Sequence, residues 1–219
     1  MLNNPELRTD WTDLDKIIVI DNFYSNPDII RTVALKAEYE MDRQDKNWPG
    51  MNSVNTFFND KFIDAFRKVT GENIIHSNDG RSGFFRSTTK NDKFKQLIHF
   101  DPNPKQVWAG VWYGTPITDE ETQNRCGTSF WYHKKLQITK MPLIEEERRK
   151  LGFYGHNEMR NFMETEGIDT SLWECHFNVP FKYNRMVIFR PWLWHSIAGM
   201  FGDSKETARL VQLFFLDVR

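Results

Sequence analysis

Residues 99–113 read HFDPNPKQVWAGVWY and join a pair of candidate metal ligands to a predicted strand. His99 and Asp101 stand two positions apart at the start of this segment, and imidazole and carboxylate groups are common ligands of transition metals. Residues Val107–Tyr113 at its end are rich in aromatic and β-branched side chains, which predicts a strand. The segment therefore predicts a metal-binding stretch that leads into the core of a β-rich fold.

A second histidine, His195, follows another strand-like run and is itself followed by Arg209. Two histidines and one carboxylate on one side of a metal, with the remaining positions open, form the ligand set of non-haem Fe(II) oxygenases. Neutral imidazoles and a hard carboxylate hold Fe(II) while the open positions admit a chelating co-substrate and dioxygen. If His99, Asp101 and His195 converge in space, the sequence predicts an oxygenase.

Each of these residues also suits a purely structural role. His99 fits a surface histidine, Asp101 a turn residue, His195 a hydrogen-bonded core residue, and Arg209 one half of an ion pair. A His-x-Asp tripeptide is short enough to arise by chance, so by itself it is only a hypothesis. The common order of these residues and their strand context favour the metal site.

Composition limits the classes of protein to which the chain can belong. The 219 residues are 39% hydrophobic with a formal net charge of −1, which predicts one globular domain with a full core. Binding to nucleic acid rests on a basic surface, and the balanced charge argues against one. The most charged run, residues 145–150, mixes both signs and is typical of a solvated helix face.

The cysteines and the amino-terminal residues bear on location. Cys126 and Cys175 lack CxxC spacing and are too few for a disulfide framework, so reduced thiols are expected. Residues 1–16 contain no basic region followed by an apolar one, and no apolar run is long enough to span a bilayer. We therefore expect a soluble, cytoplasmic protein with no membrane partner.

Helical signals dominate the first third of the chain. Residues 17–20 form a β-branched run typical of a buried strand, and Ser25 is the expected N-cap of a helix that reaches about Tyr39. A second amphipathic helix is expected over residues 61–69, ending before Gly71.

Strand signals dominate the remainder, so the order of elements predicts an α+β fold. The expected strands are residues 83–87, 107–113, 128–132, 186–189 and 210–216. Charged residues with loosely spaced apolar ones between Met141 and Gly167 predict a helical insertion in this half. Within the strand 107–113, Trp108 and Trp112 share one face with Gly110, while Tyr113 lies on the other.

The order of these motifs resembles a known superfamily. It runs through His99-x-Asp101, the strand at 108–113, Gly127–Phe130, Asn184–Phe189, Trp194-His195-Ser196 and Arg209-Leu210. This order resembles the Fe(II)/2-oxoglutarate-dependent oxygenases, and within them the prolyl-4-hydroxylase-like branch, which includes members in bacteria and tailed phages. The resemblance covers about the last three fifths of the chain, and residues 17–39 resemble the strand and helix that precede the barrel in that branch.

The resemblance implies a double-stranded β-helix, a jelly-roll or cupin-like barrel of two antiparallel sheets with the metal inside one mouth. N-terminal helices would pack on one sheet. The whole chain, 1–219, would form a single domain, with a strand and helices in 1–80 and the β-helix core in 81–219. The helical insertion at about 141–167 would interrupt this core.

The resemblance also assigns roles to residues. His99, Asp101 and His195 would bind Fe(II), and Arg209 would bind the distal carboxylate of 2-oxoglutarate. Arginine suits that role because its planar fork binds a carboxylate in bidentate fashion and stays charged when buried. The implied activity is a dioxygenase that hydroxylates a C–H bond of an amino-acid, peptidyl or small-molecule substrate with dioxygen. The presence of Asp101 favours hydroxylation, because related halogenases carry a small residue there.

The chain also departs from its relatives. Many relatives carry a serine two residues after the arginine, where this chain has Val211, so a hydroxyl of Tyr113, Ser129 or Tyr132 would have to replace it. The turn before residues 186–189 often carries glycine in relatives, whereas Asn184, which stands there in this chain, tolerates a positive φ better than most residues.

Several aromatic positions are weaker candidates for substrate contacts. His133 suits a substrate-contacting or proton-relay role, although packing is the more common role for such a histidine. Trp192 and Trp194, which precede His195, suit the lining of a substrate pocket, and core packing is again the commoner role.

Three alternatives to the oxygenase remain open. A cupin-like protein could hold another metal such as Zn or Mn, a non-catalytic binding protein could keep the barrel without turnover, and a structural assembly protein could need neither. Arg209 favours the oxygenase over all three, because a metal site alone needs no basic residue at that spacing. The sequence does not specify the substrate or the oligomeric state.

Overall fold

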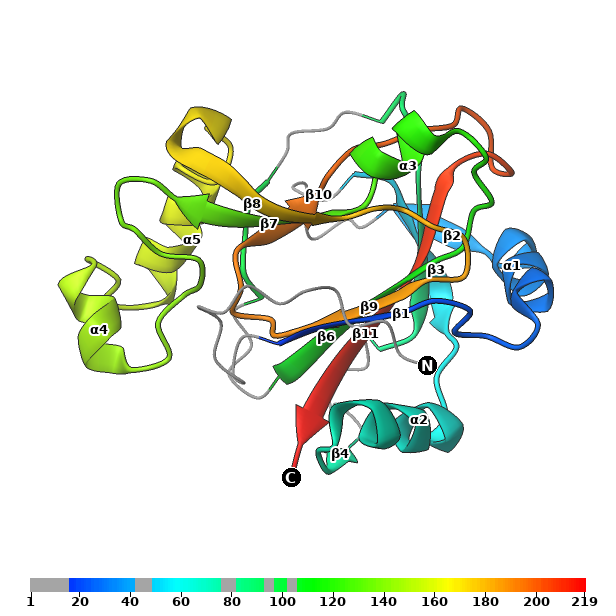
Figure 1. The fold of residues 1–219 in the computed structure, drawn as a ribbon, viewed down its shortest axis with the longest axis horizontal. Helices are drawn as coiled ribbons and strands as arrows, with labels where there is room; N and C mark the ends of the chain where they lie inside the picture. Colours follow the sequence, from blue (N-terminus) through cyan, green and yellow to red (C-terminus); the bar gives the residue numbers. More distant parts are fainter. Residues whose placement is uncertain (1–15, 42–48, 76–81, 93–96, 102–105) are drawn as a thin grey trace.

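The computed structural model describes residues 16–41, 49–75, 82–92, 97–101 and 106–219. Two antiparallel sheets lie one above the other, and helices flank them (Figure 1). Within the segment 99–113, residues 102–105 lie outside the described part, as do the amino-terminal residues 1–15. Within the described residues, no helix has the length and apolar character needed to cross a membrane.

The larger sheet has eight strands, and the strands that flank the candidate site lie in its middle. Its order is β1 (Ile17–Ile20), β9 (Met186–Phe189), β6 (Gln106–Tyr113), β11 (Arg209–Val218), β5 (Phe84–Thr88), β3 (Met51–Thr56) and β2 (Tyr39–Met41), with β4 (Ile74–Ile75) paired to the end of β11. All of its pairings are antiparallel. The six strands expected from the sequence, including residues 17–20, are all present, each within two residues of its expected bounds.

The smaller sheet carries one of the candidate ligands at its edge. Its order is β10 (His195–Ile197), β7 (Thr128–His133) and β8 (Trp173–Val179). On the other side of β10, His99 forms an isolated antiparallel bridge with His195. The segment that contains the first ligands therefore continues this sheet beyond β10.

Alternation along the strands creates a core on each face of the larger sheet. Trp108 and Trp112 of β6 pack with the helices on its outer face, while Tyr113 packs in the cluster between the two sheets. The expected facing of β6 is thus confirmed, and the two tryptophans belong to the core beneath the helices. Phe214 of β11 lies on the same outer face, against Phe66 of a helix at 5.2 Å between ring centroids.

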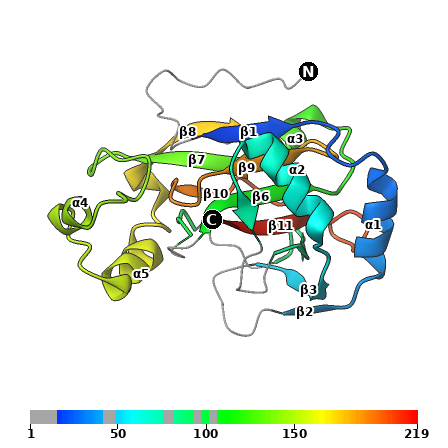
Figure 2. The same cartoon turned by 90° about the horizontal axis from the view of Figure 1, so that it is seen from below.

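Two helices cover that outer face (Figure 2). Helix α1 (Pro27–Lys36) begins after Asn26 rather than Ser25, and it ends before Ala37 because the backbone there is extended. Helix α2 (Asp60–Thr70) begins after Asn59, whose side chain accepts a hydrogen bond from the Lys61 amide. It ends at Gly71 in the left-handed conformation, φ 74°, as the glycine predicts.

Of the other helices in the described residues, one lies between β6 and β7 in the chain, and the rest lie between β7 and β8. They are α3 (Glu120–Arg125), α4 (Glu145–Lys150), α5 (His156–Thr165) and the short 3-10 helix η2 (Thr170–Leu172). Helices α4 and α5 lie within the predicted insertion 141–167 and extend from one end of the sheets (Figure 1).

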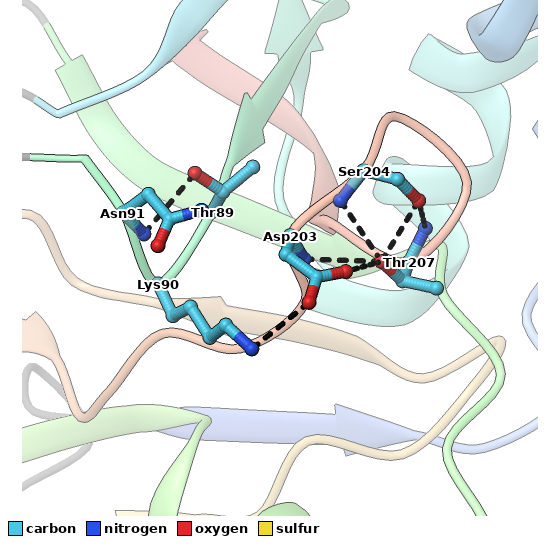
Figure 3. A network of polar contacts seen from close by, with 6 residues as sticks. All are labelled: Thr89, Lys90, Asn91, Asp203, Ser204 and Thr207. Atoms are coloured by element: carbon cyan, nitrogen blue, oxygen red, sulfur yellow. Dashed lines mark hydrogen bonds and ion pairs between the residues drawn. The ribbon is translucent and has the colours of Figure 1, made fainter.

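A polar network fixes the chain just before β11 (Figure 3). The Lys90 amide donates to the carbonyl of Gly202 at 2.9 Å, and its ammonium group pairs with Asp203 at 2.9 Å. The Thr207 hydroxyl accepts from the amides of Asp203 and Ser204, each at 3.1 Å. The network joins the loop after β5 to the loop that leads into Arg209.

Candidate metal centre

The structure brings His99, Asp101 and His195 together. One ligand atom from each lies within 4.8 Å of the others, as three donors to a single ion would. The Nε2 atoms of His99 and His195 are 3.9 and 4.0 Å from the two carboxylate oxygens of Asp101. Both imidazoles are buried, and Asp101 is partly exposed.

The backbone fixes this convergence. His99 N–H donates to the His195 carbonyl at 3.0 Å, and His195 N–H donates to the His99 carbonyl at 2.8 Å. Residues directly opposite in such an antiparallel pair point their side chains to the same face, and the two imidazole centroids are 4.2 Å apart. Asp101 N–H donates to the carbonyl of Pro191 at 2.8 Å, which fixes Asp101 to the segment before His195.

Each histidine is also held in the tautomer that a metal requires. The Nδ1 atom of His99 lies 3.0 Å from the Leu97 carbonyl, and that of His195 lies 2.8 Å from the Leu193 carbonyl. A carbonyl only accepts hydrogen bonds, so each Nδ1 carries the hydrogen and each Nε2 carries a lone pair instead of a hydrogen. Orientation of a ligating histidine by a carbonyl on its other nitrogen is common in metal sites.

Burial favours the neutral form of both imidazoles. The pKa of His99 is well below its ordinary value because of desolvation first, then the charges of His195 and Arg86. Desolvation likewise lowers the pKa of His195, although the nearby Asp101 carboxylate opposes the shift. Neutral imidazole is the form that ligates metals, so the residues could hold a divalent transition metal through two nitrogens and one hard oxygen.

Arg209, the residue expected to bind a carboxylate, is buried without an acidic partner in the described part of the chain. The side chain is 3% exposed, its Nη2 donates to the Gly127 carbonyl at 3.3 Å, and its buried Nε has no hydrogen-bond partner. Its guanidinium carbon lies 5.9 Å from the centre of the Tyr113 ring and 5.6 Å from that of Phe181. Burial lowers the pKa of Arg209, and buried guanidinium groups usually have a paired anion.

Of the expected hydroxyl groups, that of Tyr113 lies near Arg209, together with one that was not expected, that of Thr128. Tyr113 hydroxyl lies 2.8 Å from the hydroxyl of Thr128, and both side chains are buried. Ser129, the expected candidate, donates instead to Asn178 Oδ1 at 3.2 Å. Successive residues of a strand face opposite sides, so Thr128 faces Tyr113 and Ser129 faces away. Thr128 was not among the candidates from the sequence, although its position two residues before Phe130 on an alternating strand was a usable signal.

The candidate ligands and Arg209 adjoin the same apolar cluster between the sheets. His195 packs on Phe189 and Phe130 at centroid distances of 4.6 and 6.5 Å. Both phenylalanines belong to the cluster that also contains Tyr113 and Val211. Arg209 and Val211 alternate with Leu210 on β11, and Leu210 packs on the outer face. The guanidinium group and the imidazoles therefore face the interior between the two sheets.

His133 and Trp194 lie in a third cluster, beside the insertion. His133 is fully buried, with its ring 4.5 Å from that of Trp173, and it contacts Glu166 through Nε2 at 2.9 Å. Trp194 is also fully buried and packs against Phe100 and Trp173. These contacts are those of packed side chains.

Comparisons with known proteins agree with the geometry at the level of the fold. The chain belongs to DUF6445, a family of unknown function, whose model matches residues 5–211. No curated protein sequence matches the chain.

Solved structures of low sequence identity align with most of the chain. HygX from Streptomyces hygroscopicus with nickel and 2-oxoglutarate bound is 12% identical, covering 94% of this chain and 84% of that one, with a TM-score of 0.51. The HygX structure that also holds hygromycin B has the same identity and coverage and a TM-score of 0.52. A prolyl-4-hydroxylase from Pseudomonas putida is 10% identical over 94% of both chains, with a TM-score of 0.46. The chain is thus similar in fold to HygX.

Proposed function

We propose that this protein is an Fe(II)- and 2-oxoglutarate-dependent dioxygenase that hydroxylates a C–H bond of an amino-acid, peptidyl or small-molecule substrate. The observation that carries the proposal is Arg209, a buried cation without a carboxylate partner in the described residues, facing the same interior as three convergent metal-type ligands. A protein that only bound a metal would have no use for such a group. The fold similarity to HygX, whose structure holds nickel and 2-oxoglutarate, agrees with this function.

The proposed architecture is a single-domain double-stranded β-helix. The strand orders β9-β6-β11-β5 and β8-β7-β10, with His99 next in line after β10, support it. In such a barrel the chain changes sheet at each step except between its two middle strands. From β5 through the His99 segment to β11 the order is the same, because only β7 and β8 follow one another within one sheet. The strands β1, β2 and β3 then extend the larger sheet on both sides of this core.

The proposed site has two parts. His99, Asp101 and His195 would hold Fe(II), because two imidazole nitrogens and one carboxylate oxygen converge there as donors. Arg209 would bind the distal carboxylate of 2-oxoglutarate, and the Tyr113–Thr128 hydroxyl pair beside it would donate a further hydrogen bond. We assign this hydroxyl role to Thr128 with Tyr113 and not to Ser129, which faces Asn178.

When bound, Fe(II) with 2-oxoglutarate and dioxygen supplies oxidation of a C–H bond to an alcohol, with succinate and carbon dioxide as co-products. The chain itself orients the two imidazoles and shields the centre from water. Carbonyls of Leu97 and Leu193 keep both Nε2 atoms directed at the centre, and Phe130 and Phe189 exclude water from the His195 side. Asp101 fills the ligand position with a carboxylate, which favours hydroxylation. The contacts of His133 and Trp194 favour packing roles over substrate contact.

An anaerobic titration with Fe(II) and 2-oxoglutarate tests the proposal. The visible charge-transfer absorption of the chelated complex should appear in the wild type and should be absent in His99→Ala. In Arg209→Met the same absorption should need a much higher concentration of 2-oxoglutarate.

Arg190→Met is the matched control, because it removes another buried arginine that already contacts Glu72 on the opposite face of the larger sheet. This variant should form the complex at the wild-type concentration of 2-oxoglutarate. Absence of the absorption in the wild type at saturating ligand would contradict the proposal and favour a cupin-like protein that binds another metal or none. Equal effects of the two arginine variants would contradict the role of Arg209.

A further inference from the structure

The first residues of the insertion, together with Thr139 and Lys140 just before it, contact the segment that precedes His195. Trp194 N–H donates to the Thr139 carbonyl at 3.0 Å, and Met141 N–H donates to the Trp192 carbonyl at 2.8 Å. These bonds form a short antiparallel pairing centred on Lys140 and Leu193. The peptide units that precede the third ligand are thereby bonded to the start of the insertion.

The insertion contacts the segment before His99 at its end. Ile98 N–H donates to the Gly167 carbonyl at 2.8 Å, immediately after helix α5. A Cβ atom at Gly167 would lie 2.4 Å from the Ile98 carbonyl oxygen and 2.4 Å from that of Met163. Any side chain at Gly167 would therefore force a shift of the peptide that joins Ile98 to His99, of the last turn of α5, or of both.

A polar contact holds this end of the insertion in place. His133, the last residue of β7, contacts the Glu166 carboxylate through Nε2 at 2.9 Å, and its Nδ1 accepts from the Leu136 amide at 3.1 Å. Because Nδ1 accepts, Nε2 carries the hydrogen and donates to Glu166. The Glu166 carbonyl also accepts from Trp173 Nε1 at 2.8 Å, so Glu166 is fixed from both sides directly before Gly167.

Aromatic packing joins the two ends. Phe162 of α5 lies 5.5 Å from Trp194, and Trp194 in turn lies 5.2 Å from Phe100 in an edge-on arrangement. Phe100 stands between two of the candidate ligands, and Trp194 directly precedes the third. The same cluster includes Ile98 and Trp173.

We propose that the insertion is a brace for the metal centre, in which Gly167 and the His133–Glu166 pair are positioning residues that set the placement of His99 relative to His195. The inference rests on the metal site proposed above. Gly167 acts on the ligands through its backbone contact with Ile98, and the His133–Glu166 pair acts by holding the residue directly before Gly167. Residues beyond the ligands typically change metal affinity by about 10–100-fold when they are removed, and we expect an effect of about ten-fold here.

Titration of the full-length protein with Co(II) alone tests this inference, because the d–d absorption of bound Co(II) reports coordination geometry without turnover. The informative variants are Gly167→Ala, whose Cβ would meet the Ile98 carbonyl, and Glu166→Ala, which removes the partner of His133. Glu166→Gln is the rescue variant, since its amide oxygen can still accept from His133. Gly155→Ala is the matched control in the same insertion, where a Cβ would meet only the end of the Glu158 side chain, at 3.3 Å.

The expected result is about ten-fold weaker Co(II) binding and an altered spectrum in Gly167→Ala and Glu166→Ala, with wild-type behaviour in Gly155→Ala and Glu166→Gln. All titrations are made well below the melting temperature of each variant, so loss of stability alone does not move the readout. Wild-type affinity and spectrum in Glu166→Ala, whose partly exposed side chain makes a folded variant attainable, would overturn the inference. Failure of the wild type to bind Co(II), or unchanged binding in His99→Ala, would instead overturn the metal site itself.

Discussion

Both faces of the larger sheet bury arginine side chains, and Arg190 on one face differs from Arg209 on the other in what surrounds it. On the face covered by helices, Arg190 contacts both carboxylate oxygens of Glu72 and lies 3.7 Å over the Trp108 ring. On the face toward the smaller sheet, Arg209 has one long hydrogen bond to a carbonyl and no acidic partner among the described residues. Burial of a charge is costly unless it is paired. On the first face the protein itself supplies the anion that pairs with the arginine. On the second face the proposed site would receive that anion from a ligand.

Loss of a candidate ligand should have the largest effect. We expect His195→Ala to weaken binding of Fe(II) or Co(II) by at least about 100-fold, because one of three donors is removed and effects of that size already arise from residues beyond the ligands. Calorimetric titration with Co(II) measures this change. A variant that binds the metal as tightly as the wild type would show that the interior face carries no such site.

Replacement of Arg209 and of Arg190 tests the comparison directly. Arg209→Met should weaken binding of 2-oxoglutarate to the metal-loaded protein by about 100-fold, because a bidentate charge-assisted contact is lost. The free energy of unfolding of the ligand-free variant should rise by about 1 kcal/mol, since an unpaired buried charge is removed. Denaturant unfolding and ligand titration measure the two quantities.

Arg190→Met should show the reverse behaviour. The variant loses the contacts with Glu72 and Trp108, so the free energy of unfolding should fall by about 2 kcal/mol while the affinity for 2-oxoglutarate stays unchanged. If both arginine variants lowered stability equally and spared ligand binding, the two faces would not differ in function.

The two hydroxyl groups at the start of β7 should differ in their effect on 2-oxoglutarate binding, because they face opposite sides of the sheet. Thr128→Val should weaken 2-oxoglutarate binding by about ten-fold, the size of one lost hydrogen bond, whereas Ser129→Ala should leave it within about two-fold. The same titration in the metal-loaded protein distinguishes them. A larger effect at Ser129 than at Thr128 would contradict the facing of this strand.

The smallest effect concerns the ion pair between Arg185 and Asp21, which contains neither Arg190 nor Arg209. Arg185 contacts Asp21 through two nitrogens, and this hydrogen bonding, with Lys182 nearby, lowers the pKa of Asp21 to about 2. A carboxyl whose pKa is lowered in the folded state adds stability above its unfolded pKa near 4 and loses it as the pH falls toward 2. Because Asp21 is about one third exposed, we expect Asp21→Asn to cost about 1 kcal/mol at pH 7 and almost nothing at pH 2. Urea unfolding of both proteins at the two pH values measures this difference, and an equal cost at both would contradict the assignment.

Much of the fold could be predicted because its strands are locally distinctive. The runs Ile17–Ile20 and Met186–Phe189 are apolar and β-branched, and both form strands. Asn184, expected to tolerate a positive φ, has φ 61°, and its side-chain oxygen accepts from Trp112 Nε1 at 3.0 Å. Strand β3 was missed because the sequence Met51–Thr56 is mostly polar and its side chains are largely exposed, so pairing with β5 and not burial defines it.

The candidate site could be predicted in part. The spacing of His99 and Asp101 and the later His195 and Arg209 are visible in the sequence, and the structure brings the first three together. Alternation with Phe130 could have indicated the facing of Thr128, whereas the bulge after Phe130, which shifts the register of β7 against β8, has no visible signal in the sequence. The contact of Gly167 with Ile98 joins residues far apart in the chain, so no local pattern could indicate it.

The most direct test compares two ligands that differ only in the distal carboxylate. Calorimetry on the Mn(II)-loaded protein would measure the affinity for 2-oxoglutarate and for 2-oxopentanoate, which lacks that group, in the wild type and in Arg209→Met. We predict a preference of about 100-fold for 2-oxoglutarate in the wild type, falling to nearly one-fold in the variant. An equal preference in both proteins, or none in the wild type, would contradict the claim that Arg209 binds the distal carboxylate of 2-oxoglutarate.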